Sequence, residues 1–193
     1  MVFLLWLLGS MAHAQVSPAL WNASRIGATQ GQVKDQLTAA GYEPRTVKWS
    51  EPKGLAAGTL DKPGLLAMLN HHRVRNRLMD GLPKAGPSFL LVQDDTATVV
   101  YAFVRNRLWA AAFGVTHQAM KPTSEPFDPN RLTGLTAIKN DLRARCGGLA
   151  VKRRDPYGNA REWRAGCGTG KAFAHYTPEA DTPMRILLVG SGG

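Results

Sequence analysis

The stretch 165–172, AGCGTGKA, has the glycines and the lysine of a phosphate-binding loop. Such a loop needs glycine at its first position and Ser or Thr directly after the lysine, where the hydroxyl binds Mg²⁺. Here these two positions are Ala165 and Ala172, and Cys167 lies inside the loop. The sequence therefore does not favour nucleotide binding, and we interpret these glycines as turn formers between strands.

The histidines are the next candidates for chemistry, because imidazole exchanges a proton near neutral pH. His71 and His72 are adjacent, and neighbouring residues on a helix point about 100° apart, so they do not favour a shared metal ion. His117 and His175 are isolated in the sequence. One alternative stays open, a periplasmic, hydrolase-type enzyme in which His72, His117 or His175 acts as acid or base. The sequence indicates no metal site and no cofactor.

Serine and cysteine nucleophiles have little support. Ser88 and Ser124 lie in proline-rich loops without the flanking glycines of a nucleophile elbow. Cys146 and Cys167 are predicted to form a disulfide, because an exported protein folds in an oxidising compartment. Oxidised cysteines leave no thiol for Cys–His catalysis. The sequence thus favours a non-catalytic protein.

The strongest remaining candidate is a cationic surface. The formal net charge is +10, and residues 131–171 contain ten Lys and Arg against three acidic residues, a balance of +7. A concentrated positive field attracts polyanions or acidic protein surfaces, and Trp, Tyr and Arg are frequent at interfaces. The alternative is that Trp163 faces the core while the charges face water. We predict a binding surface on one hairpin, formed by Lys152, Arg153, Arg154, Tyr157, Arg161, Trp163 and Arg164.

Residues 1–14 have the pattern of a secretory signal peptide. The apolar run Val2–Leu8 is followed by Ala12, His13 and Ala14, a small-x-small cleavage pattern. Seven apolar residues at about 1.5 Å each are too short for a hydrocarbon core of roughly 30 Å, so a membrane anchor is not favoured. We expect cleavage after Ala14 and a periplasmic or secreted protein without a transmembrane segment.

The stretch Phe89–Val115 is the most hydrophobic part of the mature chain and predicts the core sheet. Apolar runs rich in Val, Phe and Tyr are interrupted at 93–95 and 105–107, as expected for three antiparallel strands joined by short turns. Within Thr98–Val104 both alternating sets of side chains are apolar. We therefore expect both faces of this strand to be covered.

Helices and two further hairpins surround this sheet in the predicted order. A helix over about 30–40 begins with the capping pair Thr29 and Gln32. A second helix starts near Asp61, and a third runs from Pro129 to Cys146. The two hairpins have strands over 149–154, 160–164, 172–176 and 184–189.

This element order predicts an α+β fold of two helix-plus-antiparallel-meander halves packed together, with an extra helix inserted in the first half. The segment 121–129 contains three prolines and is the expected connector. The N-terminal half then covers residues 15–121, and the C-terminal half covers 122–193. The disulfide would join the third helix to the second strand of the C-terminal meander.

The segment RIGATQGQVKDQLTAAGY resembles the opening of the BamE/SmpA and beta-lactamase-inhibitor-like families, with matching positions at Gly27, Thr29, Gln32, Val33 and Leu37. In these families a helix with this pattern precedes a three-stranded meander. The resemblance implies a non-catalytic envelope module that binds proteins, either as an assembly factor or as an inhibitor. The chain departs from the family pattern because it has no lipidated cysteine and carries a long insertion before the sheet.

These observations together favour an exported, non-catalytic protein of the cell envelope that acts as a protein-binding or assembly module. The expected partner is an envelope protein. A periplasmic hydrolase-type enzyme and a protein that binds an anionic envelope polymer are the alternatives. Nucleic acid is not a favoured partner, because little of it is present outside the cytoplasm.

Overall fold

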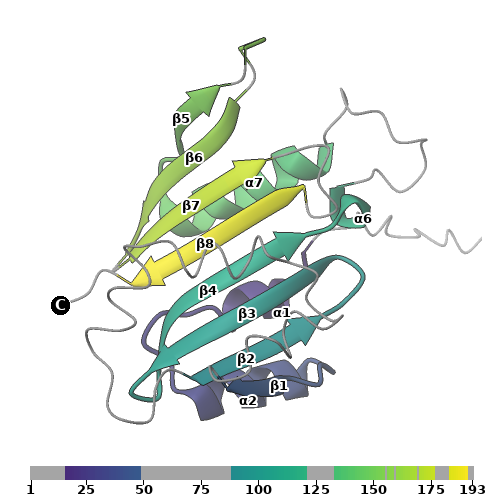
Figure 1. Ribbon diagram of the computed structural model, residues 1–193, viewed down its shortest axis with the longest axis vertical. Helices are drawn as coiled ribbons and strands as arrows, with labels where there is room; N and C mark the ends of the chain where they lie inside the picture. The colour runs from purple at the N-terminus through teal and green to yellow at the C-terminus, as the bar shows by residue number, and fades with distance from the viewer. Residues whose placement is uncertain are drawn as a thin grey trace, which may run out of the picture.

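The computed structural model describes residues 16–48, 88–120, 133–154, 156–158, 160–168, 170–176 and 183–190 (Figure 1). One eight-stranded antiparallel sheet organises them, in the order β1-β2-β3-β4-β8-β7-β6-β5. The expected α+β class is therefore confirmed. The strands are β1 (Arg45–Lys48), β2 (Ser88–Gln93), β3 (Ala97–Val104), β4 (Arg107–Val115), β5 (Ala150–Arg154), β6 (Ala160–Cys167), β7 (Gly170–Tyr176) and β8 (Met184–Gly190). The described helices are α1 (Pro18–Asn22), α2 (Gln30–Ala39), α6 (His117–Met120) and α7 (Thr133–Cys146).

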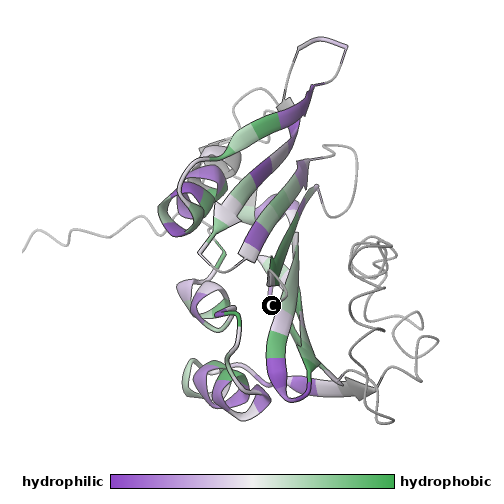
Figure 2. Ribbon diagram, turned by 90° about the vertical axis from the view of Figure 1, so that its left-hand side faces the viewer, coloured by the Kyte–Doolittle hydropathy of each residue, from purple (hydrophilic) through white to green (hydrophobic). Residues whose placement is uncertain are grey.

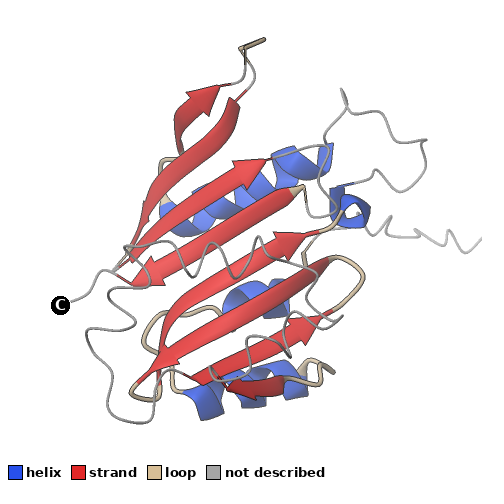
Figure 3. Ribbon diagram, viewed as in Figure 1, coloured by secondary structure: helices blue, strands red, loops and turns tan. Residues whose placement is uncertain are grey.

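The described helices form a layer on one side of the sheet. Figure 2 shows this layer edge-on, and Figure 3 shows α1 and α7 behind the strands. In α1, Trp21 stacks on Phe113 of β4 with ring centroids 4.4 Å apart. Tyr101 of β3 is fully buried, and its hydroxyl donates a 2.9 Å hydrogen bond to the carbonyl of Leu20. Burying a side chain such as Phe113 stabilises the folded state by about 1.5–3 kcal/mol. Most of the buried apolar residues lie between this layer and the sheet, which is therefore the main core.

Strand β3 is buried on both faces, as its sequence predicts. Val99, Tyr101 and Phe103 belong to the core under the helices. Val100 and Ala102 belong to a second apolar cluster on the opposite face. The second cluster also contains Phe89, Leu91, Ala110, Ala112 and Leu187, which come from β2, β4 and β8. From here on, the side of the sheet away from the described helices is called the second face.

The turn between β3 and β4 has two residues, Arg105 and Asn106, both with positive φ. This is the backbone shape of the tight hairpin turns that match strand twist, and Asn tolerates it better than most residues. The Asn106 Oδ1 accepts a 3.3 Å hydrogen bond from the backbone N–H of Gln30. Arg107 donates to the Gly27 carbonyl at 3.2 Å. The turn thereby holds the N-terminus of α2 against the sheet.

Helix α2 begins with the predicted capping box. The Thr29 hydroxyl accepts from the N–H of Gln32, and the Gln32 side chain accepts from the N–H of Thr29. Val33 and Leu37 on its inner face are completely buried. Gly41 follows the helix with φ +85°, the left-handed position that ends many helices.

Four predicted features lie outside the described residues: the signal peptide 1–14, the second helix near Asp61, the connector 121–129 and the start of the third helix at Pro129. Among the helices that the structure describes, none is long and apolar enough to cross a bilayer.

Candidate functional site

The hairpin β5–β6 lies at one end of the sheet order and carries all seven predicted binding residues. All five residues of β5 are exposed. Tyr157 in the connecting turn is 89% exposed, and Gly158 adopts a φ of +84° there. Arg154 donates a 2.7 Å hydrogen bond from Nη1 to the Gly158 carbonyl, which fixes the turn against the end of β5. The hairpin therefore displays its cations on a defined backbone.

Arg153 forms an ion pair with Glu162 within the hairpin. Its Nη1 lies 3.4 Å from Oε1 of Glu162, and the two side chains are 68% and 34% exposed. An exposed pair of this kind contributes about 0–1 kcal/mol, so it shapes the local charge more than it stabilises the fold.

Trp163 does not belong to the surface, which corrects its assignment as a binding residue. It is only 3% exposed and belongs to the core under the helices. The Nζ of Lys139 on α7 lies 5.4 Å from the centroid of its ring. Successive side chains on a strand point to opposite faces, so the neighbours Glu162 and Arg164 point to the second face. Trp163 is therefore an anchor between β6 and α7.

The same alternation separates the two β6 arginines. Arg161 lies on the helix side, with its Cζ 5.5 Å from the ring centroid of Tyr176, a core residue. Arg164 lies on the second face, with its Cζ 5.4 Å from the ring centroid of Phe173. The residues predicted to form one surface are thus distributed over both sides of the hairpin.

Strands β7 and β8 add cations to the second face that the sequence alone did not single out as one group. His175 of β7 pairs in register with Glu162 of β6 and with Arg185 of β8. Lys171, four residues before His175 on the same strand, shares its face. We define the cationic face as the four cations Arg153, Arg164, Lys171 and Arg185 together with His175, which lies among them.

A sequence signal for this face exists in the alternation of residues along β7 and β8, because side chains two positions apart on a strand share a face. Lys171, Phe173 and His175 lie two positions apart in turn, as do Arg185 and Leu187. What the sequence does not give is which of these strands are neighbours. The register between β6, β7 and β8 supplies that, because it places Arg164, Phe173 and Leu187 in one row across the sheet.

Charge is concentrated on this end of the sheet. Strands β5 to β8 carry seven Lys and Arg against one acidic residue, Glu162, a formal charge of +6. On the second face of β2 to β4, by contrast, residues such as Phe89, Leu91 and Val100 are apolar and buried. The second face is therefore divided into an apolar area and a cationic area.

The pKa of His175 is lowered from its usual value. Partial burial of the imidazole is the main cause, and the charges of Arg185, Arg153 and Arg161 act in the same direction. The carboxylate of Glu162 opposes them. His175 is therefore uncharged at neutral pH and becomes a cation only on acidification.

The histidines named for acid–base chemistry are placed differently. His175 stands opposite a carboxylate, but that carboxylate is ion-paired with Arg153. His117 begins the short helix α6, and His72 lies outside the described residues. Within the described ranges, no group of three or more His, Cys, Asp or Glu side chains could hold a metal ion.

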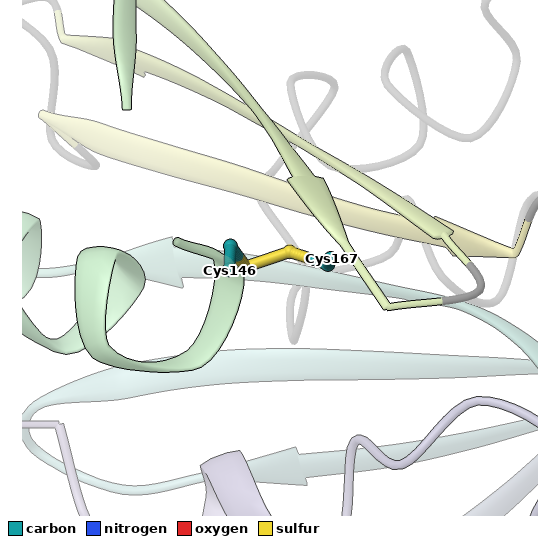
Figure 4. The surroundings of a disulfide bond; sticks show 2 residues. All are labelled: Cys146 and Cys167. Atoms are coloured by element: carbon teal, nitrogen blue, oxygen red, sulfur yellow. A yellow bond between two sulfur atoms is a disulfide. The ribbon is translucent and has the colours of Figure 1, made fainter. Parts of the chain in front are cut away.

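The predicted disulfide between Cys146 and Cys167 is present (Figure 4). It joins the last residue of α7 to the last residue of β6. Among the α7 side chains whose burial the structure describes, Ile138, Leu142 and Cys146 are buried along one face, as their spacing predicts. The helix and the bridge together fix β6, the strand that carries the centre of the hairpin surface.

No family model matches the chain, and no curated protein or solved structure matches it either.

Proposed function

We propose that the protein is an exported, non-catalytic module of the cell envelope that binds a protein partner through the hairpin β5–β6 and the adjoining strands. The observation that carries this proposal is the concentration of exposed cations, with the exposed Tyr157, at one end of the sheet. Arginine and tyrosine side chains dominate many protein interfaces because they combine large contact area with directed hydrogen bonds.

A rigid support for the hairpin favours this proposal. Trp163 is buried against α7, and the disulfide joins the end of α7 to the end of β6. Binding costs less free energy when the binding surface is already ordered in the free protein. The cations on β5 and β6 are therefore presented on a backbone that needs little ordering on association.

The cell-envelope location rests on two features. Residues 1–14 have the pattern of a signal peptide. The bridge between Cys146 and Cys167 is of the kind that persists in oxidising compartments and is rare in the cytosol. We also propose that the chain is built from two halves, 15–121 and 122–193, which meet where β4 pairs with β8.

An anionic envelope polymer is the second candidate partner, and the formal charge of +6 on β5 to β8 favours it. The two candidates differ in salt dependence. A polymer neutralised by several cations releases its condensed counterions on binding, so its affinity falls steeply with salt. A protein partner that also makes apolar and hydrogen-bonded contacts loses less affinity.

The experiment is a pull-down from envelope extract with the mature protein as bait and mass-spectrometric identification of captured proteins. The test variant replaces Lys152, Arg153 and Arg154 with Ser. We expect the wild type to capture a reproducible protein that the test variant loses at physiological salt.

The matched control replaces Arg25, Lys34 and Arg143 with Ser, which removes the same charge from other exposed positions. This control is expected to capture the same protein as the wild type. Equal capture by wild type and test variant contradicts the proposal. Circular dichroism spectra and melting temperatures of the three proteins establish that each is folded.

A further inference from the structure

We propose that the cationic face, formed by Arg153, Arg164, Lys171, His175 and Arg185, is the docking surface for an extended, acidic segment of a protein partner. This inference rests on the proposed function and specifies both the surface and the chemistry of the partner. It moves the centre of binding from the hairpin tip to the second face of β6, β7 and β8.

The accessibility of this face is the first argument. The described helices all lie on the other side of the sheet (Figure 2). Arg164 and Lys171 are exposed, and His175 and Arg185 are partly exposed. These side chains are therefore in contact with solvent and can reach a partner without rearrangement of the helix layer.

The spacing of the cations fits an extended chain. Neighbouring strands lie about 4.8 Å apart, and residues two apart on one strand lie about 6.8 Å apart. Lys171 and His175 stand on β7, with Arg164 on one neighbouring strand and Arg185 on the other. A partner segment in extended conformation presents every second side chain on one side at the same spacing of about 6.8 Å. The register places one cation in each of three successive rows along β7: Lys171, then Arg164 beside Phe173, then Arg185 beside His175. Carboxylates at alternate positions of a segment that lies along β7 can thus meet one cation in each row.

Two residues on this face favour a peptide over a uniform polyanion. Glu162 lies within the cationic face and repels a polymer that carries negative charge at every position. Phe173, with the Arg164 guanidinium over its ring, gives the face an apolar contact. A protein segment can place an uncharged side chain opposite both residues, whereas a sulfated or phosphorylated polymer cannot.

The outer edge of the sheet is a poorer docking site than this face. Strand β5 is the last strand in the sheet order, but its pairing with β6 is irregular at two places, between Val151 and Arg153 and between Arg153 and Arg154. Irregular, cationic edge strands resist the addition of another strand. We therefore infer that the partner binds across side chains of the second face and does not extend the sheet.

Fluorescence anisotropy with two labelled peptides of identical composition tests the inference. One peptide carries Asp at every second position with Ala and Leu between, and the other carries all its Asp residues in one block. We expect the alternating peptide to bind the full mature protein at least about threefold more tightly than the block peptide. Equal affinity for the two peptides overturns the match to an extended segment.

Charge variants locate the binding site of the alternating peptide. The face variant replaces Arg164, Lys171 and Arg185 with Ser, and we expect it to bind at least about tenfold more weakly, as three lost ion pairs predict. The control replacing Arg25, Lys34 and Arg143 with Ser is expected to stay within about twofold of wild type. Unchanged binding by the face variant, or equal weakening by the control, overturns the assignment.

Dextran sulfate is the probe for the other class of partner. If it binds more tightly than the alternating peptide and this binding is lost in the face variant, the surface recognises a polyanion and the proposed partner class is wrong. The pull-down separates this inference from the proposed function. If an envelope protein is captured but the alternating peptide does not bind, the proposed function is retained and the inference is overturned. If the peptide binds but no envelope protein is captured, the docking surface is retained and the proposed function is overturned.

Discussion

Asp94 organises the turn between β2 and β3 through four accepted hydrogen bonds. Its Oδ1 accepts from the N–H of Thr96 at 2.8 Å, from the Thr96 hydroxyl at 2.7 Å and from the N–H of Ala97 at 2.8 Å. Its Oδ2 accepts from the Tyr42 hydroxyl at 2.8 Å. Partial burial would raise the pKa of Asp94, but these hydrogen bonds outweigh it and hold the pKa below its usual value.

We predict that Asp94→Asn lowers the free energy of unfolding by about 1–3 kcal/mol at neutral pH, because an amide cannot accept all four hydrogen bonds. The lowered pKa of Asp94 adds stability that is present above about pH 4 and is lost as pH falls through the folded-state pKa. Urea denaturation of both proteins near pH 7 and pH 3 measures the difference. A gap that does not shrink at the lower pH contradicts this account of the turn.

His175 offers a second prediction about a single residue, with NMR titration of its imidazole as the measurement. We expect the imidazole to titrate with a midpoint below about pH 6.5. Glu162→Gln should lower this midpoint further because it removes a negative charge, and Arg185→Gln should raise it because it removes a positive charge. Because the folded-state pKa lies below the unfolded value, the stability due to neutral His175 is present above about pH 6.5 and is lost as pH falls through the folded-state pKa. A midpoint that rises in Glu162→Gln contradicts the assigned interactions.

The sequence predicted the charged residues of the site, but it did not predict the face of the sheet on which each of them lies. The alternation of apolar residues in β3 correctly places Val99 and Val100 on opposite, covered faces. In β6, charged residues flank Trp163 on both sides, so composition alone does not say which set faces the core. Packing against α7 decides it, since Lys139 and the core enclose the indole ring. The arginines were therefore found by sequence, but their division between two faces was not.

The disulfide is the element-scale feature with the clearest energetic consequence. It links α7 to β6 across 21 positions in the sequence. Closing a loop of about 20 residues limits the conformations of the unfolded chain and contributes roughly 3 kcal/mol in the chain-entropy model. The bridge therefore stabilises the part of the sheet that carries the cationic face.

We predict that the double variant Cys146→Ser/Cys167→Ser unfolds at a lower urea concentration, with a loss of roughly 3 kcal/mol. Intact mass after thiol alkylation, with and without prior reduction, establishes the bridge in the wild type. Alkylation of both cysteines without reduction, in protein purified from the periplasm, contradicts the bridge.

Helix α2 was predictable from its local sequence signals, whereas the short helix α1 was not. The capping pair Thr29 and Gln32 marks the start of α2 because the two side chains satisfy each other's backbone donors. Helix α1 has only five residues, too few to show a helical period. Its signals are Ser17, whose hydroxyl accepts from Ala19, and Pro18 in the first turn. Packing of Leu20 and Trp21 into the core explains why it forms.

At the scale of the molecule, the two meanders share one sheet through the pairing of β4 with β8. Six residue pairs, from Ala110 and Val189 to Val115 and Met184, connect them. The sequence predicts each meander, because neighbouring strands in a meander are consecutive in the chain. It does not predict this pairing, which joins strands separated by about 70 residues and depends on tertiary packing alone.

We predict that the described sheet unfolds as one cooperative unit. Variants that retain only Trp21 or only Trp163, with the other tryptophans changed to Phe, report on the first and the second meander, because Trp21 stacks on Phe113 of β4 and Trp163 lies on β6. In each variant the midpoint from tryptophan fluorescence should coincide with the midpoint from far-UV circular dichroism. Separate midpoints in either variant indicate that the two meanders unfold independently.

The position of β8 determines when the sheet can be completed during biosynthesis. Among the described strands, β8 is synthesised last, yet it lies between β4 and β7 in the middle of the sheet. Until residues 184–190 have emerged, β4 and β7 each lack the neighbour that this strand provides. An incomplete chain therefore exposes two strand edges that can pair with other chains. Translation errors or proteolysis that remove β8 leave a sheet open at its centre, a state suited to recognition by chaperones and proteases.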